Sequence, residues 1–275
     1  MEREHLIYKV RRYFESRMTQ GRAEKMWRFY LRFCAPIISW IYSSNLRMLA
    51  VLHFTDKLSK HDYIRHYSGY FRHLRKKKLN ILEIGVGGYA DPDRGGNSLR
   101  MWKYYFPNSM IYSIDICDKA KFQEERIRIF QGSQADESFL KDICIRIGSL
   151  DIIIDDGSHV NSHVITSFKA LFPFLKDGGI YVIEDTQTSY WPSEGGNSEN
   201  LNDPATSMNF FKSLTDGLNY REFLRPGYLP SYFDKNLTAV HFYHNLIFIF
   251  KGQNNDSSNM VVDGKLDQKG AAGGS

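Results

Sequence analysis

One stretch, residues 150–163 (LDIIIDDGSHVNSH), constrains the fold of this chain more than any other. It begins with a short run of apolar, mostly β-branched residues and continues with two carboxylates, a glycine and a histidine. A near-continuous apolar run is typical of a parallel strand that is buried on both faces. Ligands of open parallel sheets bind just beyond the carboxyl ends of the strands. We therefore expect Asp155, Asp156 and His159 to lie where chemistry is done.

A second stretch, residues 179–191, repeats this pattern. Its apolar run 180–183 ends in Glu184 and Asp185, and a helical pattern from about residue 159 to 175 separates it from the first strand. The two strands and the helix predict a β-α-β unit, in which the crossover is almost always right-handed. Neighbouring strands lie about 4.8 Å apart. Asp156, Glu184 and Asp185 are therefore expected to converge on one point.

Three converging carboxylates favour a bound cation. Carboxylates this close repel each other unless a cation is present, and Mg²⁺ accepts carboxylate oxygens while leaving positions for water or substrate. The alternative is that acidic residues at strand ends serve only as loop residues or helix caps, a role that Asp156 or Ser158 could fill. The second acidic pair and the histidine three residues after Asp156 favour a metal or catalytic site over this alternative.

Length and cysteine content bound the class of protein. A chain of 275 residues suits one α/β domain with additions, or two small domains. The three cysteines, Cys34, Cys117 and Cys144, show neither metal-ligand spacing nor even pairing. This usage favours a reducing, cytoplasmic setting over a disulfide-stabilised secreted protein.

The positive charge of the chain is concentrated at its N-terminus. Residues 1–32 hold nine Lys or Arg and four Glu, which accounts for the whole net charge of +5. The remainder is balanced, which argues against nucleic acid as a partner. The N-terminus lacks the apolar core of a signal peptide. The longest uncharged run, residues 33–46, is shorter than the ~20 residues of a membrane-spanning helix.

Composition divides the chain into three segments. Residues 1–54 are basic, aromatic and helical in pattern, and we expect an N-terminal cap or an oligomerisation region rather than a membrane-surface helix. Residues 55–251 hold the α/β pattern, preceded at 55–73 by what reads as a surface helix with an aromatic stripe. Residues 252–275 are polar and Gly-rich, which predicts a disordered tail. The cap favours a homo-oligomer.

A glycine turn follows the first expected strand, residues 81–84. The pattern around it is E-x-G-x-G-G, with Glu83 at its start and Gly85 and Gly87 in the turn, and it differs from the dinucleotide signature G-x-G-x-x-G. Glycines let the backbone turn tightly and approach a ligand closely. A turn-rich insert, residues 89–96, delays the next helix to about Asn97.

The following strands carry further candidate ligand contacts. The strand at 110–114 ends in Asp115, a position from which an acidic residue accepts hydrogen bonds from ribose hydroxyls. The strand at 127–130 is followed by Ser133 and Gln134, where an adenine ring could be hydrogen-bonded. A helix is expected over 137–147.

The chain then closes with a predicted β-hairpin at residues 237–250, so that five β-α repeats end in two further strands. This order predicts an α/β, Rossmann-like sheet of seven mostly parallel strands with an N-terminal helical extension. A glycine turn after strand one, an acid after strand two and a closing hairpin describe a class I methyltransferase better than a dehydrogenase. S-adenosylmethionine is then the expected cosubstrate, with Glu83 and the glycine turn at its amino-acid end and Asp115 at its ribose.

Three long motifs add a resemblance to a known family. LEIGVGGYADPDRGGNSLRMWKYYFP, SIDICDK and DIIIDDGSHVNSHVITSFKALFPFLKDGGIYVIEDTQTSYW resemble the sugar O-methyltransferases of macrolide biosynthesis, of the mycinamicin and macrocin type, over about residues 54–192. The resemblance implies a Mg²⁺ ion held by Asp156, Glu184 and Asp185, with His159 as the general base. It also places Thr55 near the methyl donor. The full set of expected cofactor contacts is Thr55, Glu83, Gly85, Gly87, Asp115, Ser133, Gln134 and Asp155.

The function expected from these features is Mg²⁺-dependent transfer of a methyl group from S-adenosylmethionine to a hydroxyl, in the biosynthesis of a natural product such as an antibiotic. The resemblance favours a sugar hydroxyl of a glycosylated small molecule. A catechol-like, polyketide or peptide hydroxyl stays open, because the same metal logic activates those acceptors. A nicotinamide oxidoreductase would not need three clustered carboxylates. A catalytically silent binding module is the non-enzyme alternative.

Overall fold

The computed structural model describes residues 22, 25–26, 29–59, 61–89, 91 and 93–267. These residues form two compact units. Unit 1 comprises the chain up to Asn80 together with Val86–Gln131, and unit 2 comprises Ile81–Gly85 and Gly132 onward. Part of the expected N-terminal helical region of residues 1–54, residues 1–21 above all, lies outside the described residues.

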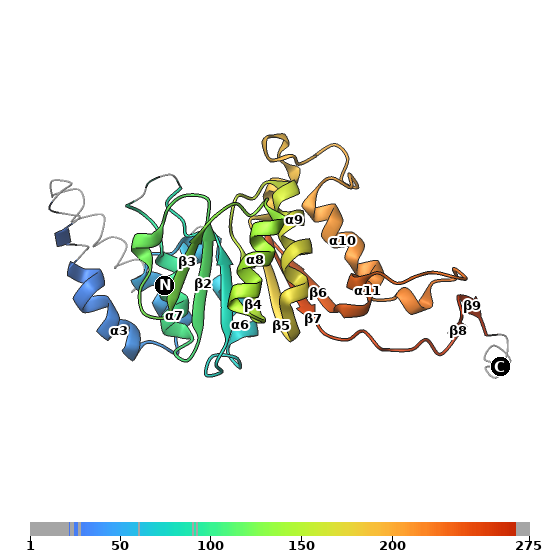
Figure 1. Cartoon of the computed structure of the whole chain (residues 1–275), viewed down its shortest axis with the longest axis horizontal. Coiled ribbons are helices and arrows are strands. Elements are labelled where there is room, and N and C mark those ends of the chain that lie inside the picture. Colours follow the sequence, from blue (N-terminus) through green and yellow to red (C-terminus); the bar gives the residue numbers. More distant parts are fainter. Residues whose placement is uncertain are drawn as a thin grey trace. The chain divides into compact units, whose positions relative to one another are not determined.

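Seven strands form one sheet in the order β3-β2-β1-β4-β5-β7-β6 (Figure 1). The pairs β2·β3, β1·β4 and β4·β5 are parallel, whereas β7 is antiparallel to both β5 and β6. The predicted class, an α/β sheet of seven mostly parallel strands ending in a hairpin, is confirmed. The strands are β1 (Asn80–Ile84), β2 (Met110–Asp115), β3 (Ile127–Gln131), β4 (Leu150–Asp155), β5 (Leu175–Glu184), β6 (Leu237–Tyr243) and β7 (Leu246–Lys251).

Unit 1 combines β2 and β3 with helices from the first part of the chain. These are η1 (Tyr30–Cys34), α3 (Ala35–Ile41), α4 (Leu46–Leu52), α5 (Asp56–Ser59), α6 (Ile64–Phe71), α7 (Asn97–Tyr105) and the short η2 (Ala120–Phe122). The side chain of Asn45 caps α4 by accepting a hydrogen bond from the Met48 amide, and α4 packs on α6 and α7. None of the helices in the described part of the chain is long and apolar enough to cross a membrane.

The core of unit 1 corrects one expectation. The aromatic stripe of residues 55–73 was predicted to lie on a surface helix, but Tyr63 and Tyr67 are buried. Tyr67 and Phe71 of α6 pack against Trp102 of α7 with ring centroids 5.1 and 5.8 Å apart. The prediction was wrong because a tyrosine stripe is compatible with either environment, and only the packing of α6 on α7 decides between them.

Unit 2 places helices beside β1, β4, β5 and the closing hairpin. They are α8 (Glu137–Ile147), α9 (Asn161–Leu171), η3 (Phe172–Phe174), η4 (Thr186–Tyr190), η5 (Pro192–Glu194), α10 (Ser207–Gly217), η6 (Tyr220–Glu222) and α11 (Tyr232–Asn236). The helices α8 and α9 lie side by side (Figure 1). Pro173 ends α9 earlier than the predicted residue 175, because proline cannot continue the backbone ladder. β5 consequently starts at Leu175 instead of at residue 180.

The segment after β7 also differs from expectation. Residues 252–275 were predicted to be disordered, but Val261–Val262 (β8) and Lys265–Leu266 (β9) form a small antiparallel hairpin. Its turn is Asp263-Gly264, with both residues at positive φ, and an Asp-Gly pair is a strong local hairpin signal that overall composition does not contain. Asn254 anchors the start of this segment through its side-chain amide, which donates to the carbonyl of Asp234. Residues 268–275 lie outside the described residues.

Candidate active site

The register of three neighbouring strands in unit 2 determines which acidic side chains meet. Ile84 of β1 lies level with Asp155 of β4, and Asp155 lies level with Ile183 of β5. Glu83 is one residue before this row, and Glu184 is one residue after it. Successive side chains of a strand point to opposite faces. Glu83 and Glu184 therefore share one face, and Asp155 points to the other.

Asp156 joins the face of Glu83 and Glu184. Its amide donates a hydrogen bond to the carbonyl of Ile84 at 3.1 Å, so the extended pairing continues one residue beyond β4. The carboxylates of Glu83, Asp156 and Glu184 each offer an oxygen, and these oxygens all lie within 4.8 Å of one another. Glu83 and Glu184 are buried, and Asp156 is half-buried. Asp156 and Glu184, two of the three carboxylates that were expected to converge, do lie close together.

A second group shares Asp156. Ligand atoms of Asp156, His159 and Asp185 also lie within 4.8 Å of one another. The Nε2 atom of His159 is 3.8 Å from Oδ1 of Asp156 and 3.6 Å from Oδ2 of Asp185. Together the two groups form what we call the carboxylate cluster: Glu83, Asp156, Glu184 and Asp185, with His159 at its edge.

The donors of the carboxylate cluster fit a hard divalent cation. Four carboxylates supply oxygen ligands of the kind that Mg²⁺ prefers, and no thiolate takes part. Buried carboxylates at this separation disfavour ionisation in one another unless positive charge is near. Glu83, which the sequence suggested as a cofactor contact, is placed by the structure among these oxygen donors.

His159 and Asp185 both adopt a left-handed backbone conformation, with φ of +58° and +53°. Such values are uncommon for residues other than glycine and occur preferentially at functional sites. The Nδ1 atom of His159 is buried and makes no hydrogen bond with any residue that the structure describes. One imidazole nitrogen thus faces the carboxylates, while the other is left with its hydrogen-bonding capacity unused.

Asp155 takes part in a separate buried network on the opposite face. Its carboxylate accepts hydrogen bonds from the Ser167 hydroxyl at 2.5 Å and from the Gln134 side-chain amide at 3.2 Å. Burial raises the pKa of Asp155 to about 6, against the opposing effects of the Ser167 hydrogen bond and the charge of His159. Ser167 was not among the predicted residues. Ser167 belongs to an ordinary amphipathic pattern on α9, so the sequence does not indicate that it contacts Asp155.

Gln134 connects this network to the loop that carries Asp156 and His159. Its side-chain amide donates to Asp155, and its carbonyl oxygen accepts the backbone N–H of Ser158 at 2.6 Å. A Cβ on Gly157 would collide with the Gln134 side chain, and a Cβ on Gly85 would collide with the Asp156 carbonyl. The two glycines therefore allow the close approach that fixes this loop. Ser133 lies beside Gln134, and its hydroxyl accepts the amide of Ala135 at 3.1 Å.

The remaining predicted residues belong to unit 1. The Asp115 carboxylate accepts the backbone amides of Val86 at 3.0 Å and Cys117 at 2.9 Å, one on each oxygen. Gly87 follows Val86 at a φ of +80°. Thr55 is buried just before α5, and its hydroxyl accepts the amide of Lys57. Asp115 thus has a structural task that the sequence did not reveal, and each of its oxygens keeps a further lone pair.

Curated relatives of this chain are O-methyltransferases by name. The chain is 47% identical over 214 residues to mycinamicin VI 2''-O-methyltransferase of Micromonospora griseorubida, an alignment that covers 77% of this chain and 54% of the relative. It is 47% identical to demethylmacrocin O-methyltransferase of Streptomyces fradiae, with coverages of 72% and 50%. It is 44% identical to 8-demethyl-8-alpha-L-rhamnosyl tetracenomycin-C 2'-O-methyltransferase of Streptomyces olivaceus, with coverages of 76% and 55%. The chain therefore spans about half the length of the curated relatives it matches.

Solved structures show the same likeness. MycE methyltransferase of the mycinamycin pathway, in complex with Mg and SAH, superposes with a TM-score of 0.76 at 46% identity, covering 78% of this chain and 56% of that one. Its complex with Mg, SAH and mycinamycin VI gives a TM-score of 0.75 at the same identity. No family model matches the chain.

Proposed function

We propose that this chain, which belongs to the mycinamicin- and macrocin-type family of class I sugar O-methyltransferases, transfers a methyl group from S-adenosylmethionine to a hydroxyl in a Mg²⁺-dependent reaction. The observation that carries the proposal is the carboxylate cluster with His159 at the ends of β1, β4 and β5. Relatives whose names state O-methylation of a glycosylated molecule support the choice of reaction.

In this proposal Asp156, Glu184 and Asp185 hold the divalent cation, with Glu83 as a fourth oxygen donor in reach of the first two. The cation, when bound, supplies a Lewis acid that lowers the pKa of an acceptor hydroxyl. The protein holds these carboxylates in place through strand register. Glu184 lies within β5, and the amide of Asp156 continues the strand pairing one residue beyond β4, which favours precise positioning of the acceptor.

His159 accepts the proton of the acceptor hydroxyl as general base. An imidazole is neutral near physiological pH and is well suited to this transfer. The unused hydrogen-bonding capacity of its Nδ1 atom and its left-handed backbone are consistent with a side chain held for a substrate. Gln134 and Asp155 hold the loop beneath it, so that the base stays fixed relative to Asp156.

The cofactor contacts remain those expected from the sequence: Thr55, Glu83, Gly85, Gly87, Asp115, Ser133, Gln134 and Asp155. Two of them are now better interpreted as supports, because Asp155 and Gln134 already bind each other and the loop carrying the cluster. Asp115 keeps lone pairs for ribose hydroxyls beside its two backbone bonds.

The acceptor that we propose is a sugar hydroxyl of a glycosylated natural product, as in the names of the relatives. A homo-oligomer and a cytoplasmic setting belong to the same proposal. Both rest on the basic, aromatic N-terminal region and on the cysteine usage of the sequence.

Calorimetric titration of the purified protein tests the proposal directly. S-adenosylmethionine is titrated in the presence of Mg²⁺ and again with EDTA, and NADPH is titrated as the competing cofactor. We expect micromolar binding of S-adenosylmethionine in both buffers, because the cation serves the acceptor. Binding of NADPH alone would overturn the proposal in favour of an oxidoreductase, and binding of neither would favour a silent module.

A further inference from the structure

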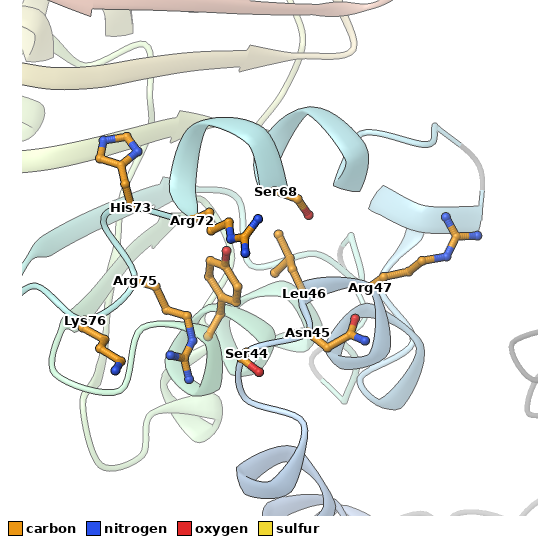
Figure 2. A pocket seen from close by; sticks show the side chains of 10 residues that line it. Ser44, Asn45, Leu46, Arg47, Ser68, Arg72, His73, Arg75 and Lys76 are labelled. Atoms are coloured by element: carbon orange, nitrogen blue, oxygen red, sulfur yellow. The ribbon is translucent and has the colours of Figure 1, made fainter.

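Unit 1 contains a cavity of about 640 Å³ whose lining is strongly cationic (Figure 2). Four of its ten lining residues are Arg or Lys, and none is Asp or Glu. The cations come from two places in the sequence, Arg47 at the start of α4, and Arg72, Arg75 and Lys76 after α6. We call this cavity the cationic pocket. Its volume lies in the range typical of small-molecule sites.

Three of the four cations of the cationic pocket have no carboxylate partner among the residues that the structure describes. The side chains of Arg72 and Lys76 make no hydrogen bond or ion pair with any residue in the part of the chain that the structure describes. Arg75 donates to the carbonyl of Ser43 at 3.1 Å and to its hydroxyl at 3.0 Å, and both acceptors are neutral. The guanidinium of Arg75 is therefore held in place by neutral acceptors alone among the described residues.

Two other cations of unit 1 do have an acidic partner, and a third is fully buried. Arg100 and Lys103 each lie 3.6 Å from a carboxylate oxygen of Glu124. Lys119, which is fully buried, donates to the carbonyls of the insert at 2.7 and 2.9 Å. The cationic pocket thus combines a concave shape with three cations, Arg72, Arg75 and Lys76, that have no acidic partner in the described part of the chain.

The hydroxyl groups of Ser44, Ser68 and Tyr105 complete the lining as neutral donors. Figure 2 shows Arg72 extending toward Ser68 and Arg75 extending toward Ser44, with Arg47 and Lys76 on opposite sides. Burial raises the pKa of Tyr105, and the charges of Arg75 and Arg72 act against that rise, so both guanidinium groups lie within electrostatic reach of the phenol. Guanidinium forks and hydroxyls are the groups that bind tetrahedral oxyanions.

We propose that the cationic pocket binds the phosphate or diphosphate group of a small molecule. A concave site of this size fits a compact oxyanion better than a polymer, and its paired arginines match the bidentate geometry of phosphate oxygens. The inference does not depend on methyl transfer, because all ten lining residues belong to unit 1 and none is a predicted catalytic, metal or cofactor residue.

The test is calorimetric titration of the intact protein with inorganic pyrophosphate at low ionic strength. We expect saturable one-site binding that weakens as salt is added. Arg72→Gln should weaken it about tenfold or more, the effect of losing a charge-assisted hydrogen bond. Lys78→Gln is the matched control, since Lys78 is exposed, lies two residues beyond Lys76 and does not line the pocket. It should change the affinity less than twofold.

A second variant keeps the test valid if Arg72→Gln does not fold. Ser68→Asp places a carboxylate on α6 four residues before Arg72, the C-cap residue of that helix, where an (i, i+4) pair supports the helix. It should abolish pyrophosphate binding while leaving the thermal midpoint unchanged or raised. Absence of saturable binding to the wild type, or equal losses in Arg72→Gln and Lys78→Gln, would overturn the proposal. So would a short single-stranded oligonucleotide that binds more tightly than pyrophosphate and responds to Arg72→Gln.

Discussion

The carboxylate cluster of unit 2 and the cationic pocket of unit 1 are constructed in different ways. Glu83 and Glu184 lie on β1 and β5, the parallel strands on either side of β4, and Asp156 directly follows β4. Residues of the cationic pocket come from the ends of helices and the turns beside them. Strand periodicity and register determine the first arrangement, whereas helix packing determines the second. The comparison teaches that a site on parallel strand ends can be read from sequence, and that a site between helices cannot.

Removing a member of the carboxylate cluster should have the largest effect. Asp156→Ala and Glu184→Ala are each expected to abolish Mg²⁺-dependent methyl transfer, because the remaining oxygens no longer hold the cation. Binding of S-adenosylmethionine should be largely retained. Steady-state turnover with and without EDTA, beside calorimetry of cofactor binding, measures both. Asp142→Ala, which removes an exposed carboxylate on α8, is the control. Near-wild-type turnover in both cluster variants, with chelator present, would contradict the metal mechanism.

A variant of His159 distinguishes proton transfer from cation binding within the same site. His159→Ala should lower turnover by about 100-fold or more, the usual consequence of losing a general base. Cofactor binding should be unchanged. Single-turnover kinetics at saturating Mg²⁺ isolate this step, with His163→Ala as the control on the following helix. A loss of less than tenfold would assign the base to another residue.

His53 in unit 1 extends the comparison to a histidine with a structural role. Its Nε2 lies 2.9 Å from the Ser39 hydroxyl, and its ring stacks on Tyr104 at 5.5 Å. Burial, with smaller effects of the charges on Arg100 and Lys103, lowers the pKa of His53 to about 3. The unfolded chain binds a proton there below pH ~6.5. The free energy of unfolding therefore carries no protonation penalty from His53 above pH ~6.5. It falls as the pH drops from ~6.5 toward 3, because the unfolded chain then binds a proton that the folded chain does not.

Urea unfolding at pH 7.5 and 5.5 checks this small effect. His53→Gln should reduce the stability lost between the two pH values by about 1 kcal/mol, since one pKa unit corresponds to ~1.4 kcal/mol. His244→Gln, at the exposed turn between β6 and β7, should leave the loss unchanged. An identical pH dependence in wild type and His53→Gln would show that the imidazole does not titrate on unfolding in this range.

Much of unit 2 could be predicted because its signals are local. The apolar runs ending in Asp156 and Glu184 each define a buried strand, and the helix between them enforces a parallel crossover. The alternation of side chains then assigns faces. The same rule, applied to β1, would also have placed Glu83 with the cluster, although the sequence suggested it as a cofactor contact. Its E-x-G context instead indicated a residue of the glycine turn that faces a ligand.

Other features had no local signal. Ser167 is an ordinary helical serine until α9 brings its hydroxyl to 2.5 Å from Asp155. The tyrosines of residues 55–73 fit a surface helix as well as a core, and α7 decides the outcome. Arg47 and Arg72 are 25 positions apart, and nothing in either segment indicates that one cavity contains both.

The sequence by itself determined the order of strands and helices, the acidic strand ends and the family, because these depend on periodicity and on contiguous motifs. The tertiary structure decided which face each carboxylate occupies, which polar residues support the loop of His159, and which cations line one cavity. Those properties arise from contacts between residues distant in the chain. Their energies depend on burial and separation, which no single segment contains.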